Sequence, residues 1–277
     1  MGRLFVEVFP NGLTLLGEVL PHTRAAAFEW LFPTGVASDP EGLEGVSRLL
    51  HGLCFRGAGE LDSRALSDAL DSLGLQRGGS AGIETSTFNG ALLAENLPAV
   101  LRLYADILRR PWLPEEELEA ERSLALQELR SIEEHPPQKL FQELRRTYFP
   151  GPHGRPPVGS QEGLQRATAE DLRAEHQRRY RPGGAILAVA GGFDWEQVRD
   201  TVGECFGDWE GTIPPLPSPQ PENSQRYRHV EQEAAQEQIG VAYPEVPADH
   251  PEFYAARMAI QVLSGGMSAR LFTEVRE

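Results

Sequence analysis

Two spacings of hydrophobic residues divide the chain into predicted strands and helices. Alternating apolar and polar positions, or short apolar runs between turn residues, predict strands over residues 4–9, 13–19, 25–32, 84–93, 185–190, 225–231 and 238–243. Apolar residues at intervals of three and four predict helices over residues 42–55, 62–73, 97–108, 114–134, 139–147, 168–180, 194–206, 251–263 and 267–276. The dipeptide Asn11-Gly12 between the first two strands favours a hairpin turn.

Two segments are rich in residues that interrupt these patterns. The glycine-rich segment Arg77–Gly82 lacks the Lys-Ser/Thr pair of a phosphate-binding loop and precedes a strand, so we interpret it as a turn. Residues 213–222 contain five prolines in ten positions, which favours an extended conformation that cannot join a core. This segment predicts a linker over residues 213–224, between an N-terminal domain (1–212) and a second domain (225–277).

Composition narrows the class of protein. Of 277 residues, 40% are hydrophobic and 24% charged, as is typical of a globular protein with a substantial core. The formal net charge of −15 argues against a nucleic-acid partner, which requires clustered Lys and Arg. The two cysteines, Cys54 and Cys205, fit a reducing compartment. No apolar run approaches a signal peptide or a membrane span, so we expect a cytoplasmic protein without a membrane partner.

The segment Gly45–Ala58, GVSRLLHGLCFRGA, carries the most informative motif. Arg48, His51 and Gly52 stand at i, i+3 and i+4, which groups them on one side of the predicted helix. Zinc peptidases with the inverted motif H-x-x-E-H use this frame for two histidine ligands and a glutamate that activates water. The frame here reads R-L-L-H-G, so both ligands and the general base are replaced.

This segment resembles the motif of the pitrilysin/insulinase family of zinc peptidases, in particular its small bacterial and mitochondrial-processing-type branch. Members of that branch read G-h-A-H-F-L-E-H-h-x-F-K-G-T, where h is apolar, and Gly45, Leu50, Phe55 and Gly57 match. The segments RRYRPGGAILAVAGGF, CFGDW and LSGGMSARLFTEVRE resemble further family segments in the same order. The resemblance implies an α+β fold, an antiparallel sheet covered by helices, followed by the start of a second homologous domain. A weak internal repeat between residues 32–50 and 243–263 is consistent with two such domains.

The resemblance also implies roles for residues outside the motif. Glu121 and Glu128 resemble the family's downstream glutamate pair, of which the later residue is the third zinc ligand, and positions 52 and 128 are 76 apart, about the family's interval. Both glutamates are then vestigial, and neither bound zinc nor an intact catalytic residue is expected. We also predict that the guanidinium of Arg48 replaces zinc and pairs with Glu128, Glu121 or both. Arg276 resembles an arginine that holds the peptide backbone in relatives.

Two other kinds of site compete with this interpretation. His51 with Glu121 and Glu128 would form an unconventional zinc site, although His51 stands where the general base belongs; a hydrogen-bonded or surface histidine is favoured. His51 and Cys54, three residues apart, would form a thiol hydrolase, but the sequence signals no oxyanion site and no orienting partner. We therefore predict that Cys54 belongs to the core.

The resemblance implies a function without catalysis. Relatives with a broken motif commonly pair with a subunit that keeps H-x-x-E-H, so we expect a hetero-oligomer that binds peptides, with a homodimer as a second arrangement. A scaffolding protein of the same fold and a metalloendopeptidase with an unconventional zinc site remain as alternatives. The helical pattern at the C-terminal end has no stop signal and relatives continue beyond it, so we expect a longer natural chain.

Overall fold

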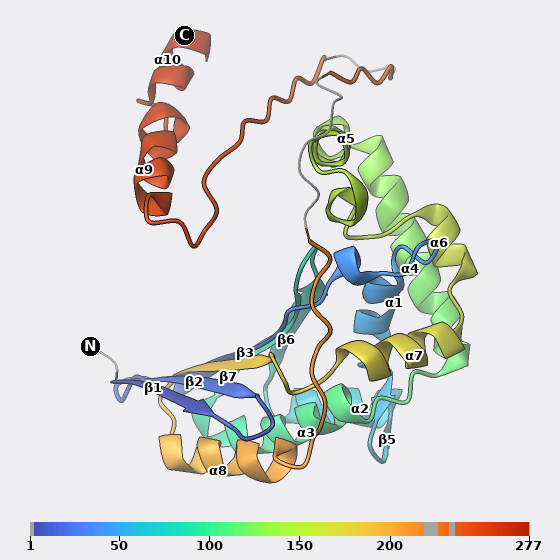
Figure 1. Ribbon diagram of the computed structural model, residues 1–277. Helices are drawn as coiled ribbons and strands as arrows, with labels where there is room; N and C mark the ends of the chain where they lie inside the picture. The colour runs from blue at the N-terminus through green and yellow to red at the C-terminus, as the bar shows by residue number, and fades with distance from the viewer. Residues whose placement is uncertain (1–2, 219–226, 233–235, 277) are drawn as a thin grey trace. The chain divides into compact units, whose positions relative to one another are not determined.

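The computed structural model describes residues 3–218, 227–232 and 236–276, and the chain forms two compact units, Met1–Gln238 and Ile239–Glu277 (Figure 1). The strands are β1 (Arg3–Val8), β2 (Thr14–Val19), β3 (Ala25–Phe32), β4 (Gly57–Ala58), β5 (Leu61–Asp62), β6 (Gln76–Ala81), β7 (Ser86–Leu93) and β8 (Ile186–Gly191). The helices are α1 (Val46–Leu53), α2 (Ser63–Ser72), α3 (Leu97–Arg109), α4 (Glu115–Glu134), α5 (Pro136–Tyr148), α6 (Gln161–Arg166), α7 (Ala169–Arg179), α8 (Trp195–Phe206), α9 (Phe253–Ser264) and α10 (Arg270–Arg276).

A six-stranded sheet in the order β1-β2-β8-β3-β7-β6 forms the centre of the first unit. Four of its strand pairs are antiparallel, while β2 and β8 are parallel, with Thr14 opposite Ile186 and Val19 opposite Gly191. The predicted class, α+β with a sheet covered by helices, is confirmed. The parallel pair was not predicted, because it joins segments from opposite ends of the unit and leaves no local signal in the sequence.

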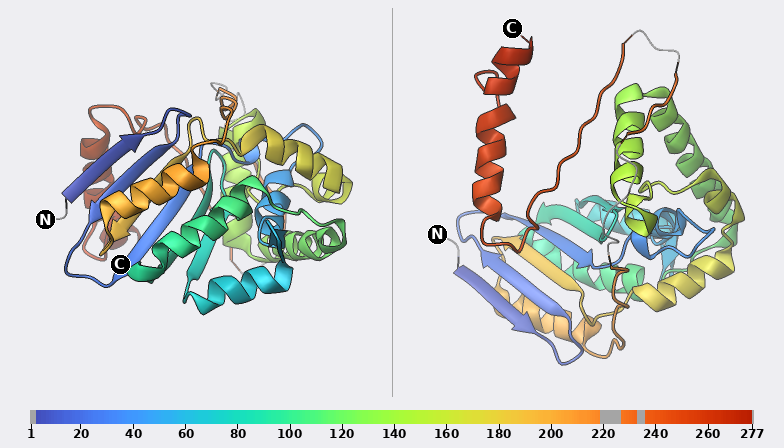
Figure 2. Two further views of the ribbon diagram at one scale, coloured as in Figure 1. Left: turned by 90° about the horizontal axis from the view of Figure 1, so that it is seen from below. Right: turned by 45° about the horizontal axis from the view of Figure 1, so that its top comes forward.

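Helices α3 and α8 lie side by side on one face of this sheet (Figure 2). The alternation along β3 explains why: Phe28, Trp30 and Phe32 are buried, whereas Ala27 and Glu29 on the opposite face of the strand are exposed. Trp30 packs against Phe206 of α8, and Phe28 packs edge-on against Tyr104 of α3. Burial of these large rings is the main contribution that attaches the helices to the sheet.

Strand β6 is an edge of the sheet, and here the sequence interpretation was wrong. The segment Arg77–Gly82 is not a turn, because its residues through Ala81 pair with β7 in an antiparallel ladder from Gln76 opposite Ala91 to Ala81 opposite Ser86. Glycine has low strand propensity, which hides the strand in the sequence. A Cβ atom at Gly79 would lie 2.2 Å from the Thr87 carbonyl oxygen, so glycine is needed for this close pairing.

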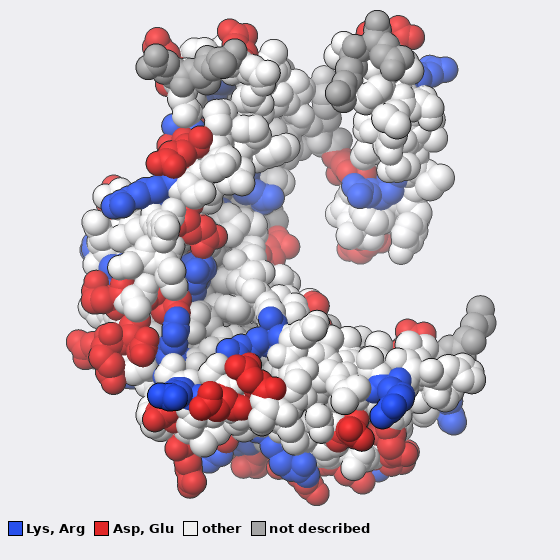
Figure 3. All heavy atoms as spheres, turned by 180° about the vertical axis from the view of Figure 1, so that it is seen from behind, with Lys and Arg blue, Asp and Glu red and all other residues white. Residues whose placement is uncertain are grey.

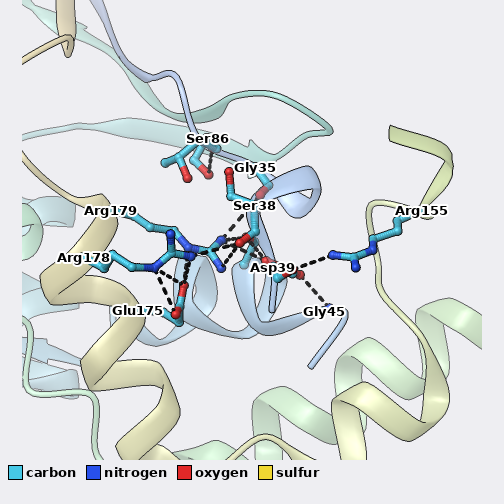
Figure 4. Close-up of polar contacts among 11 residues, drawn as sticks. Gly35, Ser38, Asp39, Gly45, Ser86, Arg155, Glu175, Arg178 and Arg179 are labelled. Carbon is cyan, nitrogen blue, oxygen red and sulfur yellow. Dashed lines mark hydrogen bonds and ion pairs between the residues drawn. The ribbon is translucent and has the colours of Figure 1, made fainter. Parts of the chain in front are cut away.

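A buried ion pair network fixes the start of α1 (Figure 4). The side chain of Arg179, at the end of α7, is 2% exposed and its Nη1 atom lies 2.9 Å from Oδ1 of Asp39 and 2.6 Å from Oγ of Ser47. Asp39 in turn accepts hydrogen bonds from the Gly45 amide and the Ser47 hydroxyl. Burial raises the pKa of the Asp39 carboxyl, although Arg179 and the two other donors favour its charged form. These contacts position the helix that carries the motif.

The second unit contains α9 and α10, in agreement with the two helices predicted there. The strands predicted over 225–231 and 238–243 are wrong for the residues that the structure describes, since 227–232 and 236–243 contain no strand. A strand requires a neighbouring strand to pair with, and neither of the two described sheets includes these segments. Part of the predicted linker, 219–224, lies outside the described residues, and the predicted domain boundaries stay a prediction.

The surface carries charges of both signs. On the face drawn in Figure 3, the Lys and Arg side chains are interspersed with Asp and Glu, in a chain whose formal net charge is −15. None of the helices within the described ranges combines the length and apolar character that crossing a membrane would require.

Candidate functional site

Helix α1 presents two of the three motif positions, Arg48 and Gly52, on the side that faces α4. Its apolar residues Val46, Leu49 and Leu53 are fully buried in the core. The helix begins directly after Gly45, whose φ of 111° lies in the left-handed region that favours glycine. The helical spacing then places Arg48 and Gly52 one turn apart, opposite the acidic residues of α4.

Arg48 pairs with both Glu121 and Glu128, as predicted. Its Nε atom donates to Oε2 of Glu128 at 3.1 Å, and its Nη1 atom lies 3.6 Å from Oε2 of Glu121. The predicted ion pair is therefore confirmed. The two carboxylates differ in burial, because 48% of the Glu128 side chain is exposed, against 5% for Glu121. Position 128 lies beyond the buried part of α4, whose buried residues are Leu118, Glu121 and Ala125.

Glu121 is the buried carboxylate of this site, with 5% of its side chain exposed. A second arginine binds it more closely than Arg48 does: Nε and Nη2 of Arg56 both donate to Oε1 of Glu121, at 3.0 and 2.7 Å. The sequence analysis missed Arg56. A signal was present, because Arg56 stands at the basic position of the motif segment that was compared with the family.

Gly52 leaves space that the Glu121 side chain fills. A Cβ atom added to Gly52 would lie 2.3 Å from Oε2 of Glu121, which is far inside van der Waals contact. Any larger residue at position 52 therefore requires the carboxylate to move. Glu121 can therefore occupy its position beside α1 because residue 52 is a glycine.

His51 turns away from the acidic residues and toward the sheet. Its Nε2 atom lies 3.0 Å from the carbonyl oxygen of Thr87, and its ring stacks on Phe88 with centroids 4.5 Å apart. Burial lowers the pKa of His51, so the neutral ring donates Nε2–H to Thr87. The prediction of a hydrogen-bonded histidine is confirmed.

Cys54 is completely buried in the core cluster, as predicted. Burial raises the pKa of its thiol well above the ordinary value. A thiol that stays protonated and has no contact with solvent is a poor nucleophile, so the His51–Cys54 pair does not form a thiol hydrolase site.

The residues at this site do not fit a zinc ion. Zinc requires deprotonated nitrogen, sulfur or oxygen ligands that converge on one point. Two guanidinium groups, from Arg48 and Arg56, surround Glu121 instead, and a permanent cation repels the metal. Within the described ranges, no three His, Cys, Asp or Glu side chains are grouped to hold a metal ion. The side chain of Arg276, the proposed peptide contact, lies outside the residues that the structure describes.

Comparison with models of protein families shows to which family the chain belongs. The family model described as "Insulinase (Peptidase family M16)" matches residues 16–159, and the one described as "Peptidase M16 inactive domain" matches residues 166–277. The chain belongs to the insulinase family. An uncharacterized zinc protease of Streptomyces coelicolor is 27% identical over 287 residues, an alignment that includes 100% of this chain and 62% of that protein. The chain thus spans less than two thirds of this relative's length.

Two solved structures share the fold of this insulinase family member. A peptidase M16 inactive domain from Pseudomonas fluorescens superimposes with a TM-score of 0.82 at 18% sequence identity, covering 99% of this chain and 68% of that one. A protease from Helicobacter pylori also gives a TM-score of 0.82, at 20% identity, with the same coverage. At these identities, the likeness extends to the fold alone.

The geometry of this insulinase family site predicts that Arg56 contributes more to stability than Arg48. Replacing Arg56 with methionine removes both short hydrogen bonds to the buried Glu121 and should lower the free energy of unfolding by about 1–3 kcal/mol. Replacing Arg48 with methionine mainly affects the half-exposed Glu128 and should cost about 0–1 kcal/mol. Urea denaturation of the two variants measures both values. A larger loss for the Arg48 variant would show that Arg48 is the main partner of Glu121.

Proposed function

We propose that this chain is a catalytically inactive member of the insulinase family that pairs with an active zinc metalloendopeptidase subunit and helps to bind its peptide substrates. The observation that carries the proposal is the contact of Arg48 and Arg56 with Glu121, directly beside Gly52. Arginine charge compensates the vestigial carboxylates, and the motif positions provide neither ligand nor base. We propose on this basis that guanidinium groups have taken the place of the metal.

Strand β6 supports the peptide-binding part of this proposal. It is an edge strand, and its residues Gln76–Ser80 are exposed. An open edge presents unpaired backbone groups to which an extended peptide adds as a further strand. The edge also borders a cavity lined by residues of α1 and α4, which include Gly52 and Glu121. A peptide on β6 would therefore lie along the former catalytic centre.

Further parts of the proposal rest on the family resemblance. Residues 225–277 are proposed to begin a second homologous domain, in which Arg276 contacts the peptide backbone. The two free cysteines, Cys54 and Cys205, support a cytoplasmic location. A scaffolding protein of the same fold is the second candidate, and the exposed edge at β6 favours peptide binding over it. The mismatch with zinc argues against the third candidate, an unconventional metalloendopeptidase.

The isolated protein is expected to hold no stoichiometric zinc and to cleave no peptide, because the water-activating carboxylate and both imidazole ligands are replaced. Elemental analysis after chelator treatment and reloading with zinc measures the metal content. As a positive control, a family member with an intact H-x-x-E-H motif should retain about one zinc per chain. One tightly held zinc in this protein, lost on replacing His51 with alanine, would contradict the proposal and favour an unconventional metalloendopeptidase.

Reconstitution tests the role as a partner. The full natural chain should be mixed with an H-x-x-E-H-bearing subunit from the same cell, and cleavage of a neutral fluorogenic peptide measured. We expect the mixture to cleave the peptide much faster than either subunit alone, because positioning contacts come from this chain. Equal rates with and without this chain would reject the peptide-binding role and favour the scaffold.

A further inference from the structure

One wall of the cavity beside β6 consists of residues that do not belong to the vestigial zinc site. It encloses about 310 Å³, at the lower end of the range for ligand pockets. Its lining comes from α1 and the segment that follows it, and from α2, α4 and β6, and consists of His51, Gly52, Phe55, Arg56, Ser63, Ser67, Arg77, Gly78, Gly79 and Glu121. Three of these ten residues are glycines, so backbone atoms form part of the wall.

Arg77 of β6 is held on this wall without a carboxylate partner. Its Nη2 atom donates to Oγ of Ser67 at 3.0 Å, and its guanidinium carbon lies 5.8 Å from the centroid of the Phe55 ring. Over the described ranges 3–218, 227–232 and 236–276, no Asp or Glu oxygen lies within ion-pair distance of this guanidinium. The hydroxyl and the ring orient the cation and leave its remaining N–H donors available.

The other charged groups of the cavity already have partners. The Glu121 carboxylate contacts Arg56 at 2.7 Å and Arg48 at 3.6 Å. Arg56 lies 3.9 Å from Glu117 in addition. His51 donates to a backbone carbonyl and is neutral. The cavity therefore presents one uncompensated positive charge, that of Arg77, together with the hydroxyl group of Ser63.

We propose that this cavity binds the carboxylate side chain of a glutamate or aspartate in a peptide held by β6, with Arg77 as its ion-pair partner. The inference rests on the proposed function, in which the chain binds peptides. A guanidinium with free donors recognises a carboxylate through charge-assisted hydrogen bonds. Arg77 belongs to the edge strand itself, so a side chain of a peptide added to that edge comes within its reach. The subunit thereby selects acidic peptides.

The test compares two peptides that differ in one group, acetyl-Ala-Ala-Glu-Ala-Ala-amide and the same peptide with Gln in place of Glu. Each is titrated into the ¹⁵N-labelled 277-residue chain at constant ionic strength, and the Nε–Hε signal of Arg77 is followed by NMR. Its absence from the Arg77→Lys variant assigns this signal. We expect a saturable shift and about tenfold tighter binding of the Glu peptide, the factor that one charge-assisted hydrogen bond typically contributes.

Two variants of equal net charge separate local recognition from a general field effect. Arg77→Gln should abolish the preference for the Glu peptide. Arg64→Gln, on α2 beside the cavity residue Ser63 but with a 93% exposed side chain, should retain it. The proposal is overturned if the two peptides bind equally, if neither shifts the Arg77 signal, if the preference survives in Arg77→Gln, or if Arg64→Gln removes it equally.

The test of the acidic pocket and the test of the subunit role can fail independently of each other. If the reconstituted pair cleaves the neutral peptide but shows no preference governed by Arg77, the acidic pocket is wrong and the subunit role stands. If the Glu peptide binds at Arg77 but this chain never increases cleavage by a partner, the pocket stands and the subunit role is wrong.

Discussion

Replacing Arg179 with methionine is expected to lower the free energy of unfolding by about 3–5 kcal/mol, the typical cost of removing one partner from a buried ion pair. The substitution leaves the Asp39 carboxylate, whose side chain is 0% exposed, without its cation. It also removes the hydrogen bonds of Arg179 to Ser47 and to the carbonyl oxygen of Ser38. Urea denaturation followed by circular dichroism measures the loss.

The neighbouring residue provides the matched control. Arg178 pairs with Glu175, as Arg179 does, but 42% of its side chain is exposed. Arg178→Met should therefore cost only about 0–1 kcal/mol. The double variant Asp39→Asn with Arg179→Met should recover part of the loss, since no unpaired charge then stays buried. Similar losses in Arg178→Met and Arg179→Met would contradict this account of the network.

Acidification is expected to destabilise the protein through His176. This residue is 8% exposed, and its Nε2 atom lies 2.9 Å from the carbonyl oxygen of Leu108. Burial lowers the pKa of His176 to about 4, from 6.5 in the unfolded chain. Below pH 6.5 the unfolded state therefore binds the proton more readily than the folded state. The stabilisation is fully present above pH 6.5 and is lost as the pH falls to about 4, a loss of about 3 kcal/mol in total.

A His176→Gln variant isolates this effect, because glutamine can still donate to Leu108 and does not titrate. The difference in unfolding free energy between the original protein and the variant should change by about 3 kcal/mol between pH 7 and pH 4. A pH profile that His176→Gln does not flatten would show that other groups control the acid sensitivity.

The parts of the fold that local sequence determines were predictable. The hairpin at Asn11-Gly12 forms, with Gly12 at a φ of 85° that suits the turn. Helix α1 follows the spacing of Val46, Leu49 and Leu53. The edge strand β6 was missed because pairing with β7 outweighs the weak strand propensity of Gly78 and Gly79. The residues of β6 alone do not show this pairing.

The sequence predicted which residues belong to the candidate site better than it predicted the contacts between them. The motif frame located Arg48, and the family interval located Glu121 and Glu128 on the facing helix. The sequence does not predict which of the two carboxylates is buried. Their burial depends on the residue at which α4 leaves the core, and the packing of the helices determines that residue. The closer partner, Arg56, lies after the end of α1, where helical spacing no longer predicts the direction of a side chain.

The position of β8 in the sheet determines at which stage of synthesis the sheet can be completed. Strand β8 lies between β2 and β3, yet Val19 at the end of β2 and Ile186 at the start of β8 are 167 residues apart. During synthesis, residues 3–185 thus include both neighbours of this strand before the strand itself exists. The facing edges of β2 and β3 stay unpaired for that time, and unpaired edges associate with other chains. The emergence of residues 186–191 from the ribosome is then the late step that joins the hairpin of β1 and β2 to the rest of the sheet and ends this period of exposure.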